Sequence, residues 1–199
     1  MRVEILAFDG FDALDVVAPW EVFARAATID SGLQVAVVCA DGPKRVTAAY
    51  GLHLDVVEAL GTPDALLVPG GSWVGGTDTG VPREIRRGTL PRIIADVAKS
   101  ARWVASVCTG ALLLGEAGIL RDRTATTNPA AMEELSRYGA TVTENRVVDD
   151  GKVVTAGAVT AGFDLALWLV QRELGIETAR AVARAIAYPM PTDVWQAPQ

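Results

Sequence analysis

Short apolar runs alternate along the chain with longer segments in which apolar residues recur at helical spacing. The runs are rich in Val, Ile and Leu, which predicts strands buried on both faces at residues 3–8, 34–40, 65–68 and 103–107. The helical spacing predicts helices at residues 15–27, 90–99, 109–117, 129–138, 159–174 and 177–187. Because strands that alternate with helices form a parallel sheet covered on both sides, the predicted fold class is α/β with a mostly parallel central sheet.

Local signals mark the ends of several of these helices. Asn128 followed by Pro129 predicts a helix start, with a capping side chain and then proline at the first helical position. Gly139 and Gly175 directly follow predicted helices and favour termination there, because glycine readily adopts the left-handed conformation of a helix end.

Two segments break the alternation of strands and helices. Residues 46–56 contain strand-like pieces, and residues 147–156 place Asp150-Gly151 between two apolar runs. Both residues favour positive φ in a two-residue turn, so the second segment predicts a β-hairpin. No internal repeat, low-complexity tract or linker divides the sequence, and residues 1–199 are expected to form a single domain.

The charge balance is acidic. Asp and Glu number 24 against 18 Lys and Arg, for a net charge of -6. A nucleic-acid-binding surface needs clustered basic residues, so this balance argues against DNA or RNA as a partner. No apolar run reaches the roughly 20 residues that span a bilayer. Glu4 within the first apolar run favours a strand over a signal peptide, and no membrane partner is expected.

The chain has two cysteines and one histidine. Cys39 and Cys108 show no pattern of a disulfide framework, which is typical of a protein of the reducing cytoplasm. A single histidine argues against a zinc site built from His and Cys, and no metal is expected. It also leaves His53 as the sole partner for a Cys–His or Ser–His pair. His53 lies in an alternating strand pattern, which favours a partly exposed structural role.

Cys108 stands between a buried strand and a helix that begins at once with small Thr109 and Gly110. A residue at so sharp a strand-to-helix turn projects from the carboxyl edge of the sheet, as in a nucleophile elbow with cysteine in place of serine. The helix start offers partial positive charge, which favours the thiolate. Cys108 is therefore a candidate nucleophile, the alternative being a small residue that fills space at a strand end. Cys39 lacks such a turn and is expected to be buried core.

A glycine pair follows the strand at 65–68. Pro69 stops that strand, and Gly70 and Gly71 allow the backbone to approach a ligand closely. The Gly71 amide, paired with the amide of Thr109, is a candidate oxyanion hole, although a glycine-rich loop can also be only a tight turn. The segment is neither a GxGxxG motif nor a phosphate loop with Lys, so no nucleotide cofactor is expected.

The loop after the first strand carries several acids at the same edge of the sheet. An acid beside Cys108 could share a proton with the thiol and later activate water. Asp9, Asp12, Asp15 and Glu21 are all candidates by composition, and for each the alternative is helix capping or solvation.

Four segments together resemble the ThiJ/PfpI superfamily: LAFDGFDALDVVAPWEVF, DALLVPGG, ASVCTGALLLGEAGIL and TAGAVTAGFDLAL. Within it the sequence is most similar to isonitrile hydratases and to the sensor halves of AraC-type regulators. The resemblance implies a flavodoxin-like three-layer sandwich, a homodimer and a reactive Cys108. It also selects Asp15 among the acids as the partner of Cys108, and it gives Thr109 a place in the site.

The sequence departs from many such relatives near residues 126–129. Sensor-type and many hydrolase-type members carry a histidine there, and this chain has Asn128. An amide is no general base at neutral pH, so a Cys–Asp mechanism is favoured over a Cys–His one. Asn128 is expected to bind substrate or an oxyanion together with Gly70, Gly71 and Trp73. Trp20 and Trp73 flank the two loops and are candidate walls of an apolar pocket.

The resemblance implies hydration of an isonitrile, R–NC, to an N-substituted formamide without any cofactor or metal. The Cys108 thiolate would attack the terminal carbon, Asp15 would position water, and Thr109 would orient groups around the sulfur. The alternatives are a small-molecule or redox sensor without efficient turnover, and an activity of the glyoxalase or deglycase type.

Overall fold

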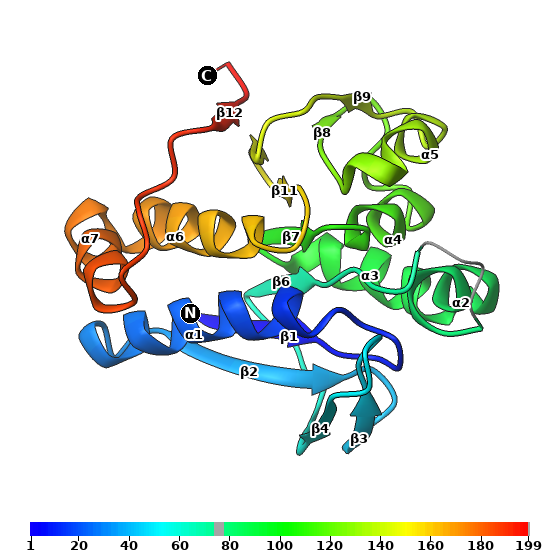
Figure 1. Cartoon of the computed structure of the whole chain (residues 1–199), viewed down its shortest axis with the longest axis horizontal. Coiled ribbons are helices and arrows are strands. Elements are labelled where there is room, and N and C mark those ends of the chain that lie inside the picture. The colour runs from blue at the N-terminus through cyan, green and yellow to red at the C-terminus, as the bar shows by residue number, and fades with distance from the viewer. Residues whose placement is uncertain (74–77, 199) are drawn as a thin grey trace.

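A central sheet with helices on both faces forms the protein, and the computed structural model describes residues 1–73 and 78–198 (Figure 1). The strand order is β12-β10-β11-β7-β6-β1-β2-β5. Neighbouring strands are parallel except for the antiparallel pair β10–β11. The bounds are β1 Arg2–Leu6, β2 Gln34–Cys39, β5 Glu58–Ala59, β6 Ala65–Val68, β7 Trp103–Val107, β10 Val147–Asp150, β11 Val153–Ala156 and β12 Val194–Gln196. The four predicted strands are confirmed.

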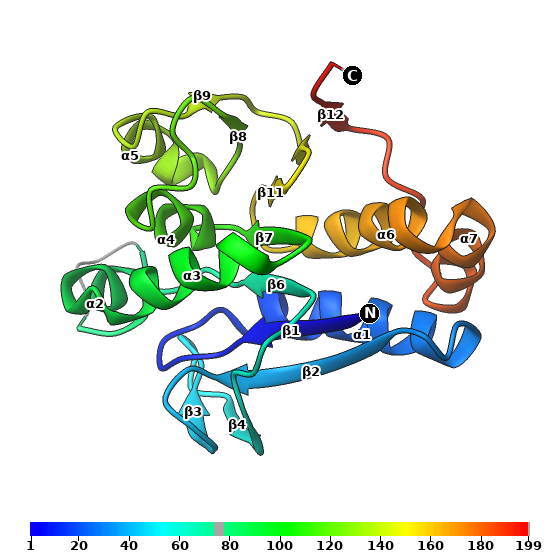
Figure 2. The ribbon, with the colours of Figure 1, turned by 180° about the vertical axis from the view of Figure 1, so that it is seen from behind.

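The helices form two layers, one on each face of the sheet (Figures 1 and 2). One layer packs α1 (Ala13–Ile29) against α6 (Ala161–Leu174) and α7 (Ile176–Ala185). The other contains α2 (Gly80–Arg87), α3 (Thr89–Ser100), α4 (Gly110–Glu116) and α5 (Met132–Ser136). This arrangement is the predicted flavodoxin-like three-layer sandwich.

The core lies between the sheet and these layers. Every residue of β6 and β7 is buried, as their almost entirely apolar sequences predict for strands covered on both faces. From α1, Phe23 is buried against the sheet, and its ring centroid lies 6.3 Å from that of Trp103. Burying a side chain of this size stabilises the fold by about 1.5–3 kcal/mol.

The hairpin of residues 147–156 is confirmed, but its turn lies one residue later than Asp150-Gly151. Asp150 pairs with Val153, so the two turn residues are Gly151 and Lys152. Gly151 has φ 70, whereas Lys152 is not left-handed, the pattern of a type II′ turn. Asp150 therefore completes β10, where its carboxylate accepts from Thr124 N at 2.9 Å.

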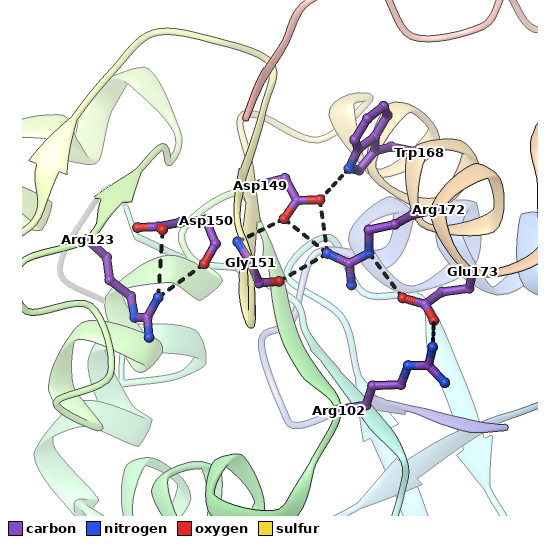
Figure 3. A network of polar contacts seen from close by, with 8 residues as sticks. All are labelled: Arg102, Arg123, Asp149, Asp150, Gly151, Trp168, Arg172 and Glu173. Carbon is purple, nitrogen blue, oxygen red and sulfur yellow. Dashed lines mark hydrogen bonds and ion pairs between the residues drawn. The ribbon is translucent and has the colours of Figure 1, made fainter. Parts of the chain in front are cut away.

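A polar network holds this hairpin against α6 (Figure 3). Asp149 of β10 accepts from Trp168 Nε1 at 2.7 Å and from Arg172 Nη1 at 2.9 and 3.0 Å. Its Oδ1 also accepts from the Gly151 amide at 3.0 Å. Arg172 pairs in addition with Glu173. The network therefore links β10, at the end of the sheet that holds the antiparallel pair, to α6.

The predicted helix at 129–138 is divided. Asn128 Oδ1 accepts from Ala130 N at 3.0 Å and Pro129 opens a short 3₁₀ turn, which confirms the predicted start. The α-helix itself covers only Met132–Ser136. Gly139 has φ 81 and follows the end of this segment as predicted.

Short elements account for the remaining differences. Residues 46–56 belong to an antiparallel pair, β3 (Lys44–Thr47) and β4 (His53–Val56). A second small pair joins β8 (Thr124–Ala125) and β9 (Thr141–Val142) in parallel. Neither α2 nor β12 was predicted from the sequence; in Figure 1, α2 lies at the right of the molecule and β12 lies beside the C-terminus.

The connections of the sheet create a crevice beside β1. The chain moves outward from β1 to β2, then returns to β6 on the other side of β1 and continues outward to β7. The connections that follow β1 and β6 therefore lead to helices on opposite faces of the sheet, and open α/β sheets bind ligands at such a switch point. Within residues 1–73 and 78–198, no helix is long and apolar enough to cross a membrane.

Candidate active site

Cys108 occupies the turn between β7 and α4, next to the switch point. Its φ is 56, a left-handed conformation that is uncommon for a residue with a Cβ. Its N–H donates to the carbonyls of Ala156 at 3.0 Å and Gly157 at 2.8 Å, and its own carbonyl accepts from Thr127 Oγ1 at 2.8 Å. These bonds hold the strained turn in place, as strained functional positions require.

Three donors surround the Cys108 sulfur. Asn128 Nδ2 donates to Sγ at 3.3 Å, and the backbone amides of Thr109 and Val159 also act on the thiol. Asn128 Oδ1 is already committed to Ala130 N, so the amide must present its NH₂ group to the sulfur. All three donors lower the pKa of the thiol because they stabilise the thiolate.

Burial opposes these donors. Cys108 is 5% exposed, and desolvation followed by the charge of Asp15 raises the pKa of its thiol to about 11. The contribution of Asp15 exists only while that carboxylate is ionised. The thiolate is therefore favoured when the proton resides on Asp15.

Asp15 lies in the first turn of α1 and is completely buried. Its Oδ2 accepts from the Gly70 amide at 2.9 Å, whereas Oδ1 has no hydrogen-bond partner within the described part of the chain. Burial, and next the charge of Asp12, raises the pKa of Asp15 well above its usual range. Contacts with the Gly70 amide and the Cys108 thiol act in the opposite direction. Asp15 and Cys108 thus form a buried pair in which each group changes the pKa of the other.

The glycine pair brings the loop after β6 against its neighbours. A Cβ on Gly70 would lie 2.5 Å from Thr109 Oγ1, and one on Gly71, whose φ is 146, would lie 2.1 Å from the Gly10 carbonyl oxygen. Only glycine fits at such distances. The Gly71 amide donates to Thr109 Oγ1 at 3.0 Å.

This bond changes the expected oxyanion hole. The Gly71 amide donates to the Thr109 hydroxyl, so it is not free to act with the Thr109 amide on an oxyanion as predicted, and the Thr109 amide acts on the Cys108 thiol. The donor that joins Thr109 and Asn128 at the sulfur is instead the amide of Val159, which has φ 30. No sequence signal identified Val159, since any residue type supplies a backbone N–H.

A pocket of about 280 Å³ opens over Cys108. It is lined by Asp12, Ala49, Tyr50, Gly71, Ser72, Trp73, Cys108, Thr109, Asn128 and Val159. Trp73 is in the wall as predicted, whereas Trp20 lies on α1, 39% exposed, and does not line it. Asp15 does not line the pocket, so it influences the pocket through its interaction with Cys108.

The other candidate acids have different surroundings. Asp12 caps α1 by accepting from Leu14 N at 3.1 Å and lines the pocket. Asp9 accepts from Thr47 N at 3.0 Å outside the pocket. Glu21 pairs with Arg25 on the surface of α1. Of these acids, only Asp15 shares a buried contact with the thiol.

The single histidine is remote from this chemistry. His53 is an exposed residue of β4, where Nδ1 lies 3.1 Å from Thr47 Oγ1. Cys39 is fully buried at the end of β2, and burial raises the pKa of its thiol to about 11. No group of three or more His, Cys, Asp or Glu side chains in the described ranges could hold a metal ion.

Fold and site together define an α/β protein with a strained cysteine at the carboxyl edge of a parallel sheet, paired with a buried aspartic acid. Residues 1–172 match the DJ-1/PfpI family. The chain belongs to this family, also called ThiJ/PfpI, as its sequence motifs predicted.

Individual relatives agree with this assignment. The chain is 37% identical to isonitrile hydratase from Pseudomonas putida over 191 residues, which cover 94% of this chain and 78% of that protein. A ThiJ/PfpI family protein from Pseudomonas syringae superposes with a TM-score of 0.84 at 28% identity, covering 96% of this chain and 76% of the other. DJ-1 from Schizosaccharomyces pombe shares the fold, with a TM-score of 0.78 at 18% identity over 95% of this chain and all of that one (100%).

Proposed function

We propose that this protein is an isonitrile hydratase, converting R–NC and water to the formamide R–NH–CHO. The observation that carries the proposal is the pairing of Cys108 with the buried carboxyl of Asp15 in a site without histidine. Similarity to the Pseudomonas putida enzyme supports the same activity. The carbon of an isonitrile is electrophilic towards a thiolate and needs no metal to be attacked.

In the first step the Cys108 sulfur bonds to the terminal carbon of the isonitrile. The proton shared with Asp15 is delivered to the same carbon. The product is a thioimidate, R–N=CH–S–Cys108. The amides of Thr109 and Val159 and the side chain of Asn128 hold the thiolate before attack. A general acid in this position typically accelerates a reaction by roughly 10²- to 10⁴-fold.

Water then adds to the thioimidate carbon from the pocket. Of the two protons of this water, one reaches the nitrogen and the other passes through the ionised carboxylate of Asp15 to the sulfur, as the carbon–sulfur bond breaks to release R–NH–CHO. The thiol regains its proton, so the cycle consumes one isonitrile and one water. Since the pKa of Asp15 is raised, this carboxyl can serve as acid in the first step and base in the second.

The test is loss of the isonitrile infrared band and chromatographic detection of the formamide. Wild type should turn over neutral isonitriles, and Cys108→Ser should not. Cys39→Ala is the matched control, because Cys39 is the other cysteine and is buried away from the pocket. Equal rates for wild type and Cys108→Ser would overturn the proposal.

The alternative is a redox sensor, which the same isonitrile assay distinguishes from an enzyme. If no isonitrile is consumed while mild peroxide oxidises Cys108 preferentially, the site is that of a redox sensor. We favour the enzyme because burial raises the pKa of Cys108, which lowers the resting thiolate that can attack peroxide, whereas in the proposed reaction Asp15 exchanges the proton with the thiol. The homodimer also remains a prediction, to be measured by light scattering in solution.

A further inference from the structure

Asp12 is the one charged side chain among the described residues that line the pocket. It lies at the N-terminus of α1 and is held from two sides. Its N–H donates to the Gly70 carbonyl at 2.9 Å, and its Oδ1 accepts from Leu14 N at 3.1 Å. This fixed position keeps a carboxylate beside the path to Cys108.

The remaining lining offers no compensating positive charge. Within the described residues no Lys or Arg lines the pocket, and Ala49 and Val159 are apolar. Tyr50 and Trp73 present aromatic rings, whose faces attract cations. Beneath Cys108 lies a second carboxyl, Asp15. A ligand that approaches the sulfur therefore meets acidic and aromatic groups.

We propose that Asp12 selects substrates by charge, so that the pocket admits neutral and cationic isonitriles and rejects isonitriles that carry a carboxylate. The inference rests on the proposed function for the identity of the substrate. The charge selection itself acts on any reagent that must reach Cys108, and it can be measured without turnover.

Two methanethiosulfonate reagents of similar size provide the measurement. One carries a trimethylammonium group and the other a sulfonate. In each reaction the Cys108 thiolate attacks the reagent's sulfenyl sulfur, a mixed disulfide forms and methanesulfinate leaves. The rate at Cys108 is followed by peptide mass spectrometry and divided by the rate with a free thiol. The ratio of cationic to anionic rates cancels any change in the reactivity of the thiol.

We expect this ratio to favour the cation in wild type and to fall roughly tenfold in Asp12→Asn, because a unit charge near the path is removed. Asparagine keeps the helix cap. Salt at about 1 M, with a Debye length of about 3 Å, should lower the wild-type ratio in the same direction. Asp9→Asn is the matched control, since Asp9 lies in the same loop outside the pocket.

An unchanged ratio in Asp12→Asn, or an equal fall in Asp9→Asn, would overturn the inference. Asp12→Ser also retains a capping oxygen and is measured in parallel, so that a folding defect of one variant leaves the other to decide.

Isonitriles supply the second measurement. Methyl isocyanoacetate is neutral, and isocyanoacetate is the matching anion. Wild type should prefer the ester, and Asp12→Asn should reduce that preference by a similar factor. If neither compound is consumed while the reagent ratio still falls in Asp12→Asn, the proposed function fails and the charge selection stands. If both are consumed with the same preference in wild type and Asp12→Asn, the charge selection fails and the proposed function stands.

Discussion

The side-chain amide of Asn128 donates a hydrogen bond to the sulfur of Cys108 at 3.3 Å. The orientation is fixed, because the other end of the amide caps the following turn at Ala130. An amide cannot accept a proton at neutral pH, so Asn128 stabilises the thiolate without acting as its base. One side chain thus serves both the local fold and the site.

Asn128→Ser should separate these two roles. Serine keeps a capping oxygen but is too short to replace the donor at the sulfur. A hydrogen bond to a charged group is worth about 1.5–3 kcal/mol, so we expect the pKa of Cys108 to rise and its alkylation by iodoacetamide at pH 7.5 to slow roughly tenfold. Asn128→Ala should slow alkylation similarly and also lose about 1 kcal/mol of stability with the cap. An unchanged alkylation rate in Asn128→Ser would remove Asn128 from the site.

Asp15→Asn should impair isonitrile turnover by roughly 10²- to 10⁴-fold, because an isosteric amide can neither give nor take the proton. Glu21→Gln is the matched control, since Glu21 belongs to the same helix and forms a surface ion pair with Arg25. Steady-state turnover and circular dichroism would be measured on both variants. A folded Asp15→Asn protein with near-wild-type turnover would remove Asp15 from the proposed mechanism, which would then rest on Cys108 alone.

Asp15→Asn should also stabilise the fold. The folded-state pKa of Asp15 lies above its unfolded value, so the unfolded chain loses this proton at lower pH than the folded one. Its contribution therefore lowers stability as pH rises from about 4 through the folded-state pKa. We expect Asp15→Asn to have a higher Tm than wild type at pH 7 and to lose this advantage near pH 4. A Tm difference that does not depend on pH would contradict the raised pKa.

The position of the candidate site at one edge of the sheet could be predicted from the sequence, because it depends on where individual strands end. The strands that end before Asp9, Pro69 and Cys108 are nearly continuous apolar runs, and parallel strands bring their carboxyl ends to one edge. The strained turn at Cys108 was also predictable, since a helix begins immediately after a buried strand. These features require no knowledge of distant contacts.

The details that failed depend on contacts between distant segments. The Thr109 hydroxyl binds the Gly71 amide 38 positions away, and this bond occupies the amide expected in the oxyanion hole. The pairing of β12 with β10 joins segments separated by two helices, so nothing in the three residues Val194–Gln196 predicts a strand. Asp15 could be selected among the four acids only through the family resemblance, since composition does not reveal burial.

The network around Asp149 predicts that the sheet is sensitive to loss of this one carboxylate (Figure 3). Asp149 is 7% exposed and accepts from Trp168, Arg172 and the Gly151 amide. Removing its carboxylate takes from Arg172 one of two buried acidic partners and leaves Trp168 Nε1 without its acceptor, so Asp149→Ala should cost about 2–4 kcal/mol, or roughly 5–15 °C in Tm. Asp149→Asn should cost less, since it keeps the side-chain volume and one acceptor oxygen.

Asp96→Ala is the matched control for this prediction. Asp96 pairs with Lys99 on the surface, with side-chain exposures of 73% and 76%, so its loss should change stability by no more than about 0.5 kcal/mol. Thermal unfolding compares the variants, and amide hydrogen exchange locates the effect. Exchange should accelerate first in β10, β11 and β12, because the backbone carbonyl of Asp149 also accepts from Ala197 N at 3.0 Å. A Tm loss in Asp149→Ala no larger than in Asp96→Ala would show that the network does not hold the hairpin to α6.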